Sequence, residues 1–237
     1  MIKVELHTHT ADDPSDAIPH TTADLIQRAS ELGFHALAIT LHDRQLDLTS
    51  YRAFARDRAV VLIAGIERTI EGKHVLLLNF PAKATETIRS LDEIAALKRA
   101  HPGGLVIAPH PFYPNSTCLR GLMDRHAHLF DAVEQSYFYT PEIDFNEAAR
   151  AWARRHAKPM VGNSDLHRLY QLGRTYSLVD AERSPDAICE AVREGRVEVR
   201  SEPISLVQAA RLFAELTVAQ VGKTWRDRWP ATEPAAA

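Results

Sequence analysis

Hydrophobic and polar positions follow two alternating patterns along the 237-residue chain. Short runs of β-branched and aliphatic residues are separated by segments whose apolar residues recur at helical spacing. This alternation is typical of repeated β-α units, so it predicts an α/β fold with a mostly parallel sheet or barrel. Seven strands are predicted, at residues 3–6, 36–39, 60–66, 74–80, 105–108, 132–135 and 160–162.

Residues typical of helix ends lie between the predicted strands. The segment 90–93, Ser-Leu-Asp-Glu, has the spacing of a capping box. Thr140 and Ser184 each precede a proline suited to the first turn of a helix. Gly33 and Gly195 lie where helices are expected to end.

The pattern predicts a single domain, because no linker, repeat or low-complexity tract divides the chain. Residues 1–203 are expected to form the barrel. From 204 to about 221 apolar residues recur at helical spacing, which predicts a C-terminal amphipathic helix at 204–226, packed on the outside of the same domain. Residues 227–237 are expected to form a flexible tail.

Composition narrows the class of protein. A formal charge of −3 gives no general attraction to a polyphosphate backbone and favours small substrates. The two cysteines form no disulfide framework, and the chain has neither a leader-like start nor the roughly 18 apolar residues of a membrane span. We therefore expect a cytoplasmic protein that does not bind membranes.

Histidine is unusually abundant, with twelve in the chain. His7 and His9 directly follow the first strand, and alternation along an extended chain points both imidazoles to one side. Two such ligands can hold one metal ion, although a lone His-x-His pair is a weak signal.

Four other strand ends carry histidine or carboxylate. His42 follows the second strand, Glu67 the third, His110 the fifth, and Asp165 and His167 the seventh. Any one alone is best explained as a cap or turn residue. Together they meet at the carboxyl edge of a parallel β-α fold, where active sites form. Mixed nitrogen and oxygen ligands suit Zn²⁺, Mn²⁺ or Fe²⁺.

In this order the motifs resemble the polymerase and histidinol phosphatase (PHP) family of metal-dependent phosphoesterases. The resemblance covers roughly residues 1–200 and is carried by the segments 7–10, 39–43, 65–67, 109–111 and 164–167. It implies a distorted seven-stranded β/α barrel with two or three divalent ions at the carboxyl ends of the strands.

The resemblance also implies a ligand set. Glu67 corresponds to a bridging carboxylate, and it shares one metal with His7, His9 and Asp165. A second metal and a third are implied for two further pairs. These are His42 with His167, and His74 with His110.

Two positions depart from the family pattern. The family has an acid shortly after the His-x-His pair, and Asp16 matches best, with Asp12 and Asp13 as rivals. The family commonly has Asp before the histidine of its second motif, where this chain has Leu41. If that Asp orients a ligand, Asp43 or a backbone carbonyl must replace it.

Phosphate recognition is expected to need cations near the strand ends. Arg44, Arg68, Arg168 and Arg174 are candidates by position, and each could equally form a surface ion pair. His20 lies in the loop after the first strand, where it could approach substrate or serve helix entry. The remaining histidines are predicted to be surface or capping residues: His35, His101, His126, His128 and His156.

The resemblance, together with the ligand set, implies a hydrolase of phosphate esters, with a nucleotide, sugar phosphate or histidinol phosphate as substrate. A metal-bound hydroxide is the expected nucleophile, with Glu67, Asp165 and His42 serving catalysis through it. No Gly-x-Ser-x-Gly motif is present, and Cys118 has no basic neighbourhood beyond Arg120, so no covalent intermediate is expected.

Three other functions use similar residues. An exonuclease acting on short oligonucleotides needs stacking aromatics, for which the candidates are Phe112, Tyr113, Tyr137, Phe138 and Tyr139. A metal-dependent amidohydrolase usually needs a lysine at a strand end, whereas Lys73 and Lys158 lie at strand starts. A non-catalytic metal-binding module would be expected to lack ligands, and this chain has nearly the full set.

Overall fold

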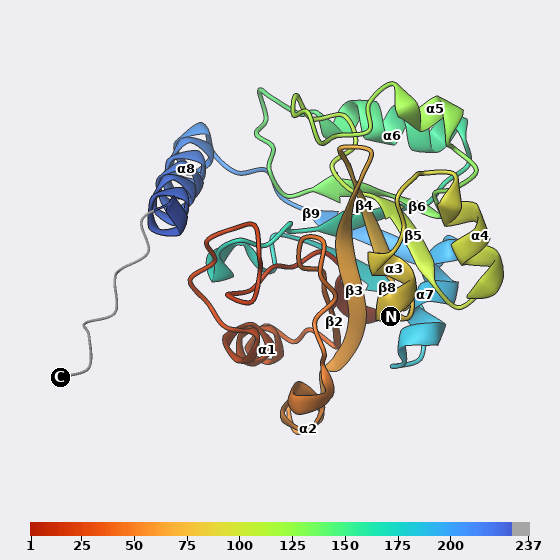
Figure 1. The fold of residues 1–237 in the computed structure, drawn as a ribbon, viewed down its shortest axis with the longest axis horizontal. Coiled ribbons are helices and arrows are strands. Elements are labelled where there is room, and N and C mark those ends of the chain that lie inside the picture. The colour runs from red at the N-terminus through yellow and green to blue at the C-terminus, as the bar shows by residue number, and fades with distance from the viewer. Residues whose placement is uncertain (229–237) are drawn as a thin grey trace.

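The computed structural model describes residues 1–228, with side chains to residue 224, and its strands form one strongly curved sheet, a nearly closed barrel (Figure 1). The strand order is β7-β6-β5-β4-β3-β2-β1-β8-β9. Its strands are β1 (Ile2–Glu5), β2 (Ala36–Ile39), β3 (Val61–Ile70), β4 (Lys73–Leu78), β5 (Leu105–Ala108), β6 (Ala132–Ser136), β7 (Met160–Asn163), β8 (Thr175–Val179) and β9 (Val197–Ser201).

The expected α/β barrel is confirmed in class, but its strand count was wrong. Each of the seven expected strands forms, and β8 and β9 add two more. Strand β8 pairs antiparallel with both β1 and β9. Both were overlooked because neither is a continuous apolar run. Thr175–Val179 alternates between buried and half-buried residues, and Val197–Ser201 alternates between half-buried and exposed residues.

The expectation of a mostly parallel sheet was also wrong. Four neighbouring strand pairs are parallel and four are antiparallel. The decisive difference is that β3 and β4 form a hairpin, where a β-α unit was expected. Its tight turn is made by Glu71 and Gly72, both with positive φ, which suits a two-residue hairpin loop.

Strand β7 approaches β8 and β9 at a glycine and narrows the gap in the barrel. The Gly162 N–H donates to Ser177 Oγ at 2.9 Å, and the Ser177 hydroxyl donates to the Gly162 carbonyl at 3.1 Å. A Cβ at position 162 would lie 2.8 Å from both the Tyr176 carbonyl oxygen and Val199 Cγ1. The close approach therefore requires glycine.

Helices cover the outside of the barrel. They are α1 (Thr22–Glu31), α2 (Arg52–Arg56), α3 (Ala82–Glu86), α4 (Glu93–Ala100), α5 (Leu122–Arg125), α6 (Asn146–Arg155), α7 (Pro185–Arg193) and α8 (Leu206–Arg228), with 3₁₀ turns at Thr49–Tyr51 and Leu169–Gln171. Within residues 1–228, none of these helices combines the length and apolar character needed to cross a membrane.

Of the five residues or segments predicted to start or end helices, three do so and two do not. Ser184 caps α7 by accepting from the Ala187 N–H, and Gly33 and Gly195 follow helices with positive φ. The Ser90 side chain caps nothing, because α4 starts at Glu93 without a side-chain cap. Thr140 accepts from the backbone of Ile143 in a turn, and α6 begins only at Asn146.

Three apolar clusters stabilise the barrel. One lies beneath α4, α5 and α6, around Phe130 and Trp152. A second joins the strands to α7, and the third lies beneath α1 and α2. The polar residues considered below therefore sit at the end of a scaffold whose packing does not involve them.

Helix α8 lies at the edge of the molecule (Figure 1), where Leu212 packs against Tyr137 and Lys223 donates to the Pro14 carbonyl, so the expected packed amphipathic helix was partly right. It starts two residues later than expected and includes residues 227 and 228, which were assigned to the tail. Residues 229–237 of that expected tail lie outside the described residues. Among the described side chains of α8 only Leu212 is buried, whereas Phe213, Val218 and Val221 are more than half exposed.

We predict that Gly162→Ala destabilises the protein by about 1–3 kcal/mol, because the added methyl overpacks against β8 and β9. Denaturant unfolding measures this change. Gly121→Ala is the matched control, since nothing lies within 4 Å of a Cβ there and its φ is −63°. Equal stability of the two variants would show that the seam between β7 and β8 is looser than described.

Candidate metal centre

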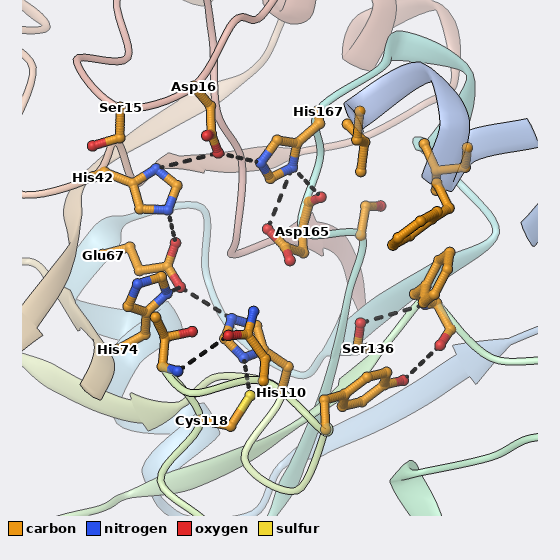
Figure 2. Close-up of a pocket in the computed structure, with 18 of the residues that line it drawn as sticks. Ser15, Asp16, His42, Glu67, His74, His110, Cys118, Ser136, Asp165 and His167 are labelled. Carbon is orange, nitrogen blue, oxygen red and sulfur yellow. Dashed lines mark hydrogen bonds and ion pairs between the residues drawn. The ribbon is translucent and has the colours of Figure 1, made fainter. Parts of the chain in front are cut away.

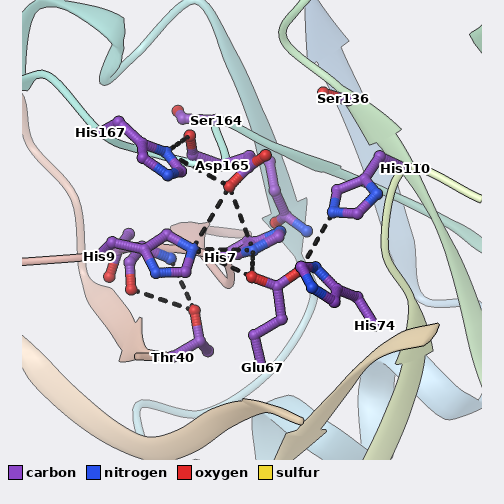
Figure 3. Close-up of polar contacts among 12 residues, drawn as sticks. His7, His9, Thr40, Glu67, His74, His110, Ser136, Ser164, Asp165 and His167 are labelled. Atoms are coloured by element: carbon purple, nitrogen blue, oxygen red, sulfur yellow. Dashed lines mark hydrogen bonds and ion pairs between the residues drawn. The ribbon is translucent and has the colours of Figure 1, made fainter. Parts of the chain in front are cut away.

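Adjacent strands bring the candidate ligands to one end of the barrel (Figure 3). His7 and His9 follow β1, whereas Glu67 lies inside β3 and His74 inside β4. In the hairpin register Glu67 pairs with Leu76 and Thr69 pairs with His74, so Glu67 and His74 share a face of the sheet.

The Glu67 carboxylate lies at the centre of the cluster and is 1% exposed. Its Oε2 atom lies 3.3 Å from Nε2 of both His7 and His9, and 3.1 Å from Nε2 of His42. Its Oε1 atom lies 2.7 Å from His74 Nδ1. The two oxygens thus face two different groups of imidazoles.

His110 completes the Oε1 side, with its Nε2 atom 3.1 Å from Glu67 Oε1. The Cys118 thiol lies 3.4 Å from the other ring nitrogen, Nδ1. The backbone of His110 has a φ of 29°, a strained value for a non-glycine residue, and its N–H donates to Glu134 at 2.7 Å. The ring is therefore held in place from both ends.

The largest group of converging donor atoms among the described residues is formed by His7, His9, Glu67 and Asp165. His7 Nε2 and His9 Nε2 lie 3.2 Å apart, and Asp165 Oδ1 lies 3.3 Å and 3.4 Å from them. All four ligand atoms lie within 4.8 Å of one another. This mixture of imidazole and carboxylate donors fits a divalent transition metal such as Zn²⁺.

Glu134 on β6 orients His7, and the sequence patterns had not singled it out. Its Oε1 atom contacts His7 Nδ1 and accepts from the Asn163 side chain, both at 2.9 Å. A carboxylate on the far nitrogen of an imidazole fixes the ring and leaves Nε2 free for a metal. Like Glu67, it is an acid near the end of an apolar strand, and that shared pattern was the available signal.

Asp13 orients two imidazole rings in the way that Glu134 orients His7. Its carboxylate lies 2.9 Å from His9 Nδ1 and 3.0 Å from His42 Nδ1, and it accepts from the His42 N–H at 3.0 Å. Asp13 therefore orients His42, the role for which an acid was expected at the position that Leu41 occupies. The expectation that Asp43 or a backbone carbonyl replaces that acid was wrong, because Asp43 pairs with Arg68.

The three aspartates of the loop after β1, which are alternative candidates for one metal ligand, differ in their distance from the cluster. Asp16 Oδ2 lies 2.9 Å from His167 Nε2 and 3.8 Å from His42 Nδ1, at the edge of the cluster. Asp12 accepts from the Thr22 hydroxyl and lies outside the groups of candidate ligands. Of the three acids, Asp13 and Asp16 thus join the site and Asp12 stays apart.

Charge compensation in the cluster is strong. Burial disfavours the charged imidazoles, but the neighbouring carboxylates outweigh it and raise the pKa of His7 and His9 to about 10 and that of His42 to about 11. Burial likewise opposes the ionised form of Glu67, yet the surrounding histidines hold its pKa well below its usual value. Without metal, protons thus supply the positive charge that the carboxylates require.

The cluster forms one wall of a cavity of about 770 Å³ (Figure 2). His42, Glu67, His74, His110, Asp165 and His167 face the cavity from that wall. Neutral polar residues from the 115–117 loop and apolar residues of α8 complete the lining. The candidate metal ligands are therefore accessible to a small molecule.

The residues expected to bind phosphate lie elsewhere. Arg68 is engaged by Asp43 and the Ile88 carbonyl, and Arg168 by the backbone of His167 and Glu215. Arg44 and Arg174 are likewise missing from the cavity lining. The position of each near a strand end along the chain did not reveal which way its side chain points.

His20 also stays out of the cavity. Its Nε2 atom lies 2.9 Å from the His9 carbonyl oxygen, and burial lowers its pKa to about 4. It therefore supports the loop that follows β1. Of the five histidines expected at the surface or at caps, none contacts the cluster, although only His128 is exposed and the other four are half-buried.

The comparisons with known proteins agree with this fold. A family model described as PHP-associated matches residues 144–197, a segment that includes Asp165 and His167. A comparison with curated proteins found no match.

Solved structures with similar folds have several activities. A two-domain protein from Bacteroides vulgatus containing a predicted PHP-like metal-dependent phosphoesterase is 20% identical, with 91% of this chain and 69% of that chain covered and a TM-score of 0.65. A lesion-specific endonuclease from Pyrococcus furiosus is 18% identical, with 84% and 57% covered and a TM-score of 0.56. An amidohydrolase from Chromobacterium violaceum is 15% identical, with 91% and 96% covered and a TM-score of 0.53. At these identities the likeness establishes the fold.

We predict that Asp13→Asn weakens metal binding by about 10-fold to 100-fold, because an amide orients the two imidazoles less firmly than a carboxylate. Titration calorimetry with Zn²⁺ or Mn²⁺ measures the affinity. Asp12→Asn, one residue away and outside the cluster, should leave it unchanged. A stronger effect at Asp12 would reverse the roles assigned to the two acids.

We also predict that the metal-free protein loses thermal stability as the pH rises from 7 to 10. His7 and His9 have folded pKa values of about 10, above the ordinary 6.5, so their stabilising protonation is complete below pH 6.5 and is lost as the pH passes through 10. A bound cation should flatten this profile in melting experiments. A metal-free protein that gains stability over this range would contradict the charge balance described above.

Proposed function

We propose that the chain is a member of the PHP domain family and a metal-dependent hydrolase of phosphate esters, a proposal that its PHP-associated segment and its fold support. One observation carries the proposal. The donor atoms of His7, His9, Glu67 and Asp165 converge within 4.8 Å at the wall of a cavity large enough for a small molecule.

The residues suit more than one ion. Glu67 presents Oε2 to His7, His9 and His42, and Oε1 to His74 and His110, as a bridging carboxylate would. Divalent ions, with zinc, manganese and iron as the candidates, would activate water and neutralise charge on the phosphoryl oxygens. Two or three ions are proposed because the nine candidate ligands exceed what one ion uses: His7, His9, Asp16, His42, Glu67, His74, His110, Asp165 and His167.

The protein's own residues have distinct roles in this proposal. Asp13 and Glu134 orient imidazoles, and Glu67 sets the separation of the two halves of the centre. Asp165, with its side chain 29% exposed, lines the cavity and can therefore face a bound phosphoryl group. Its backbone φ of 45° holds the carboxylate at a position that an ordinary extended strand end would not reach.

Covalent catalysis is less well supported. The Ser164 hydroxyl is buried and donates to Glu5 at 2.6 Å, so its proton is already held by a carboxylate. Cys118 is buried against His110. Each has a possible base beside it, but both residues are only 1% exposed, and a nucleophile for an acyl or phosphoryl intermediate must reach the substrate.

An amidohydrolase and a nuclease share the fold. Among the described residues that line the cavity there is no lysine, and Lys73 donates to the Ser116 carbonyl at 2.6 Å, which disfavours a lysine-dependent amidohydrolase. A nuclease acting on short oligonucleotides is our second candidate, because Tyr113 and Phe138 line the cavity and offer stacking surfaces. The nearly complete set of candidate ligands argues against a non-catalytic module.

We predict that Glu67→Gln lowers phosphoesterase activity at least 100-fold, because the bimetal geometry shifts and a displacement of about 1 Å costs on the order of a hundredfold in rate. Turnover of phosphomonoesters and short oligonucleotides by the Mn²⁺-loaded or Zn²⁺-loaded protein is the assay. Chelation should abolish it, and thiol alkylation should not.

The exposed His128 provides the control, and His128→Gln should keep both turnover and metal content. Circular dichroism should show that Glu67→Gln still folds, since the apolar clusters do not include Glu67. Normal turnover by Glu67→Gln with full metal content would overturn the proposed centre.

A further inference from the structure

Helix α8 supplies an apolar wall to the cavity. Leu212, Phe213 and Leu216 all line it, and Phe138 and Phe145 extend the same apolar surface. In Figure 2 the blue ribbon of α8 lies across the cavity from His42, Glu67 and His74. A substrate whose phosphoryl group meets the metal centre would therefore present its leaving group to this wall.

Polar contacts fix the position of this wall. Lys223 donates to the Pro14 carbonyl at 2.6 Å and Gln220 donates to the Ser15 carbonyl at 3.2 Å. Tyr170 donates to Glu215 at 2.9 Å. These contacts tie α8 to the loop that holds the site aspartates and to the segment that follows the last candidate ligand, so the wall and the metal centre are positioned together.

The cavity offers no fixed positive charge away from the metal centre. Among the described residues that line it, none is lysine or arginine, and the uncharged polar groups come from Ser15, Thr69, Tyr113, Ser136, Ser164, Gln171 and the 115–117 loop. Of the basic side chains described on α8, Arg211 pairs with Glu215 and Lys223 donates to backbone carbonyls. A second anionic group on a substrate would lose water without gaining a partner, which is costly.

We propose that the preferred substrates are phosphate esters of an aromatic alcohol that carries no further negative charge, with Phe213 and Leu216 as specificity-determining residues. The inference rests on the proposed phosphoesterase function. An aromatic leaving group would bury its ring against the apolar wall, while the ester phosphate alone occupies the metal centre. Phe213 is 67% exposed and thus presents a ring face that a ligand can cover.

Three substrates with similarly basic alkoxide leaving groups test this preference: benzyl phosphate, 4-carboxybenzyl phosphate and glycerol 1-phosphate. In each, the ester P–O bond breaks, the oxygen of water binds phosphorus and a proton goes to the leaving alkoxide, which yields the alcohol and inorganic phosphate. We expect kcat/KM for benzyl phosphate to exceed the other two by about tenfold.

Substitutions in the wall give the second test. Phe213→Ala and Leu216→Ala should each lower kcat/KM for benzyl phosphate by about fivefold to tenfold and leave methyl phosphate within about twofold. Binding of benzylphosphonate, measured by calorimetry, should weaken to the same extent. Val218→Ala, 72% exposed on the same helix and absent from the lining, is the matched control and should change nothing.

The outcomes separate this inference from the function on which it rests. If no phosphate ester is hydrolysed with any of the metals, the phosphoesterase proposal fails. If methyl phosphate and glycerol 1-phosphate are hydrolysed but benzyl phosphate is no better, or if Phe213→Ala and Val218→Ala behave alike, only the aromatic preference fails. Faster hydrolysis of 4-carboxybenzyl phosphate than of benzyl phosphate would likewise overturn it.

Discussion

A buried carboxylate must be compensated by positive charge, and this requirement organises the whole end of the barrel around Glu67. With a residue exposure of 1%, the Glu67 carboxylate has lost nearly all contact with water. Imidazoles from several strands supply the compensation, and further acids hold those imidazoles in turn. The result is a site built in layers, in which each charge is positioned by a group of opposite sign.

Much of this site was predictable, because the carboxyl ends of neighbouring parallel strands lie at the same edge of a sheet, whatever the course of the connecting helices. His42, His110 and Asp165 were all identified from their places after apolar runs, and each lies in the cluster. The orienting acids Glu134 and Asp13 were harder to identify. Their importance lies in which imidazole nitrogen they contact, and that depends on side-chain directions that spacing along one chain does not specify.

The strands, the helix α8 and the arginines that were predicted wrongly or only in part depend on tertiary contacts. The two additional strands come from alternating segments that are at most partly buried, where tertiary contacts outweigh the local pattern. The antiparallel pairing of β3 with β4 depends on the two-residue turn at Glu71 and Gly72. For α8, helical spacing of apolar residues correctly indicated a helix, but the same residues suit packing on the barrel or lining a cavity. The prediction that arginines near the strand ends bind phosphate was wrong for a similar reason. The direction of a long side chain depends on its neighbours in the fold, and Arg68 turns to Asp43.

The β3–β4 hairpin limits how this protein can change over evolutionary time. Glu67 and His74 share a face of the sheet because the two-residue turn at Glu71 and Gly72 fixes the register of the hairpin. In that register Glu67 lies opposite Leu76, two residues from His74. Inserting or deleting one residue in that turn would rotate His74 to the opposite face. Lineages that keep the centre should therefore vary in the length of exposed surface loops, while this hairpin keeps a constant length.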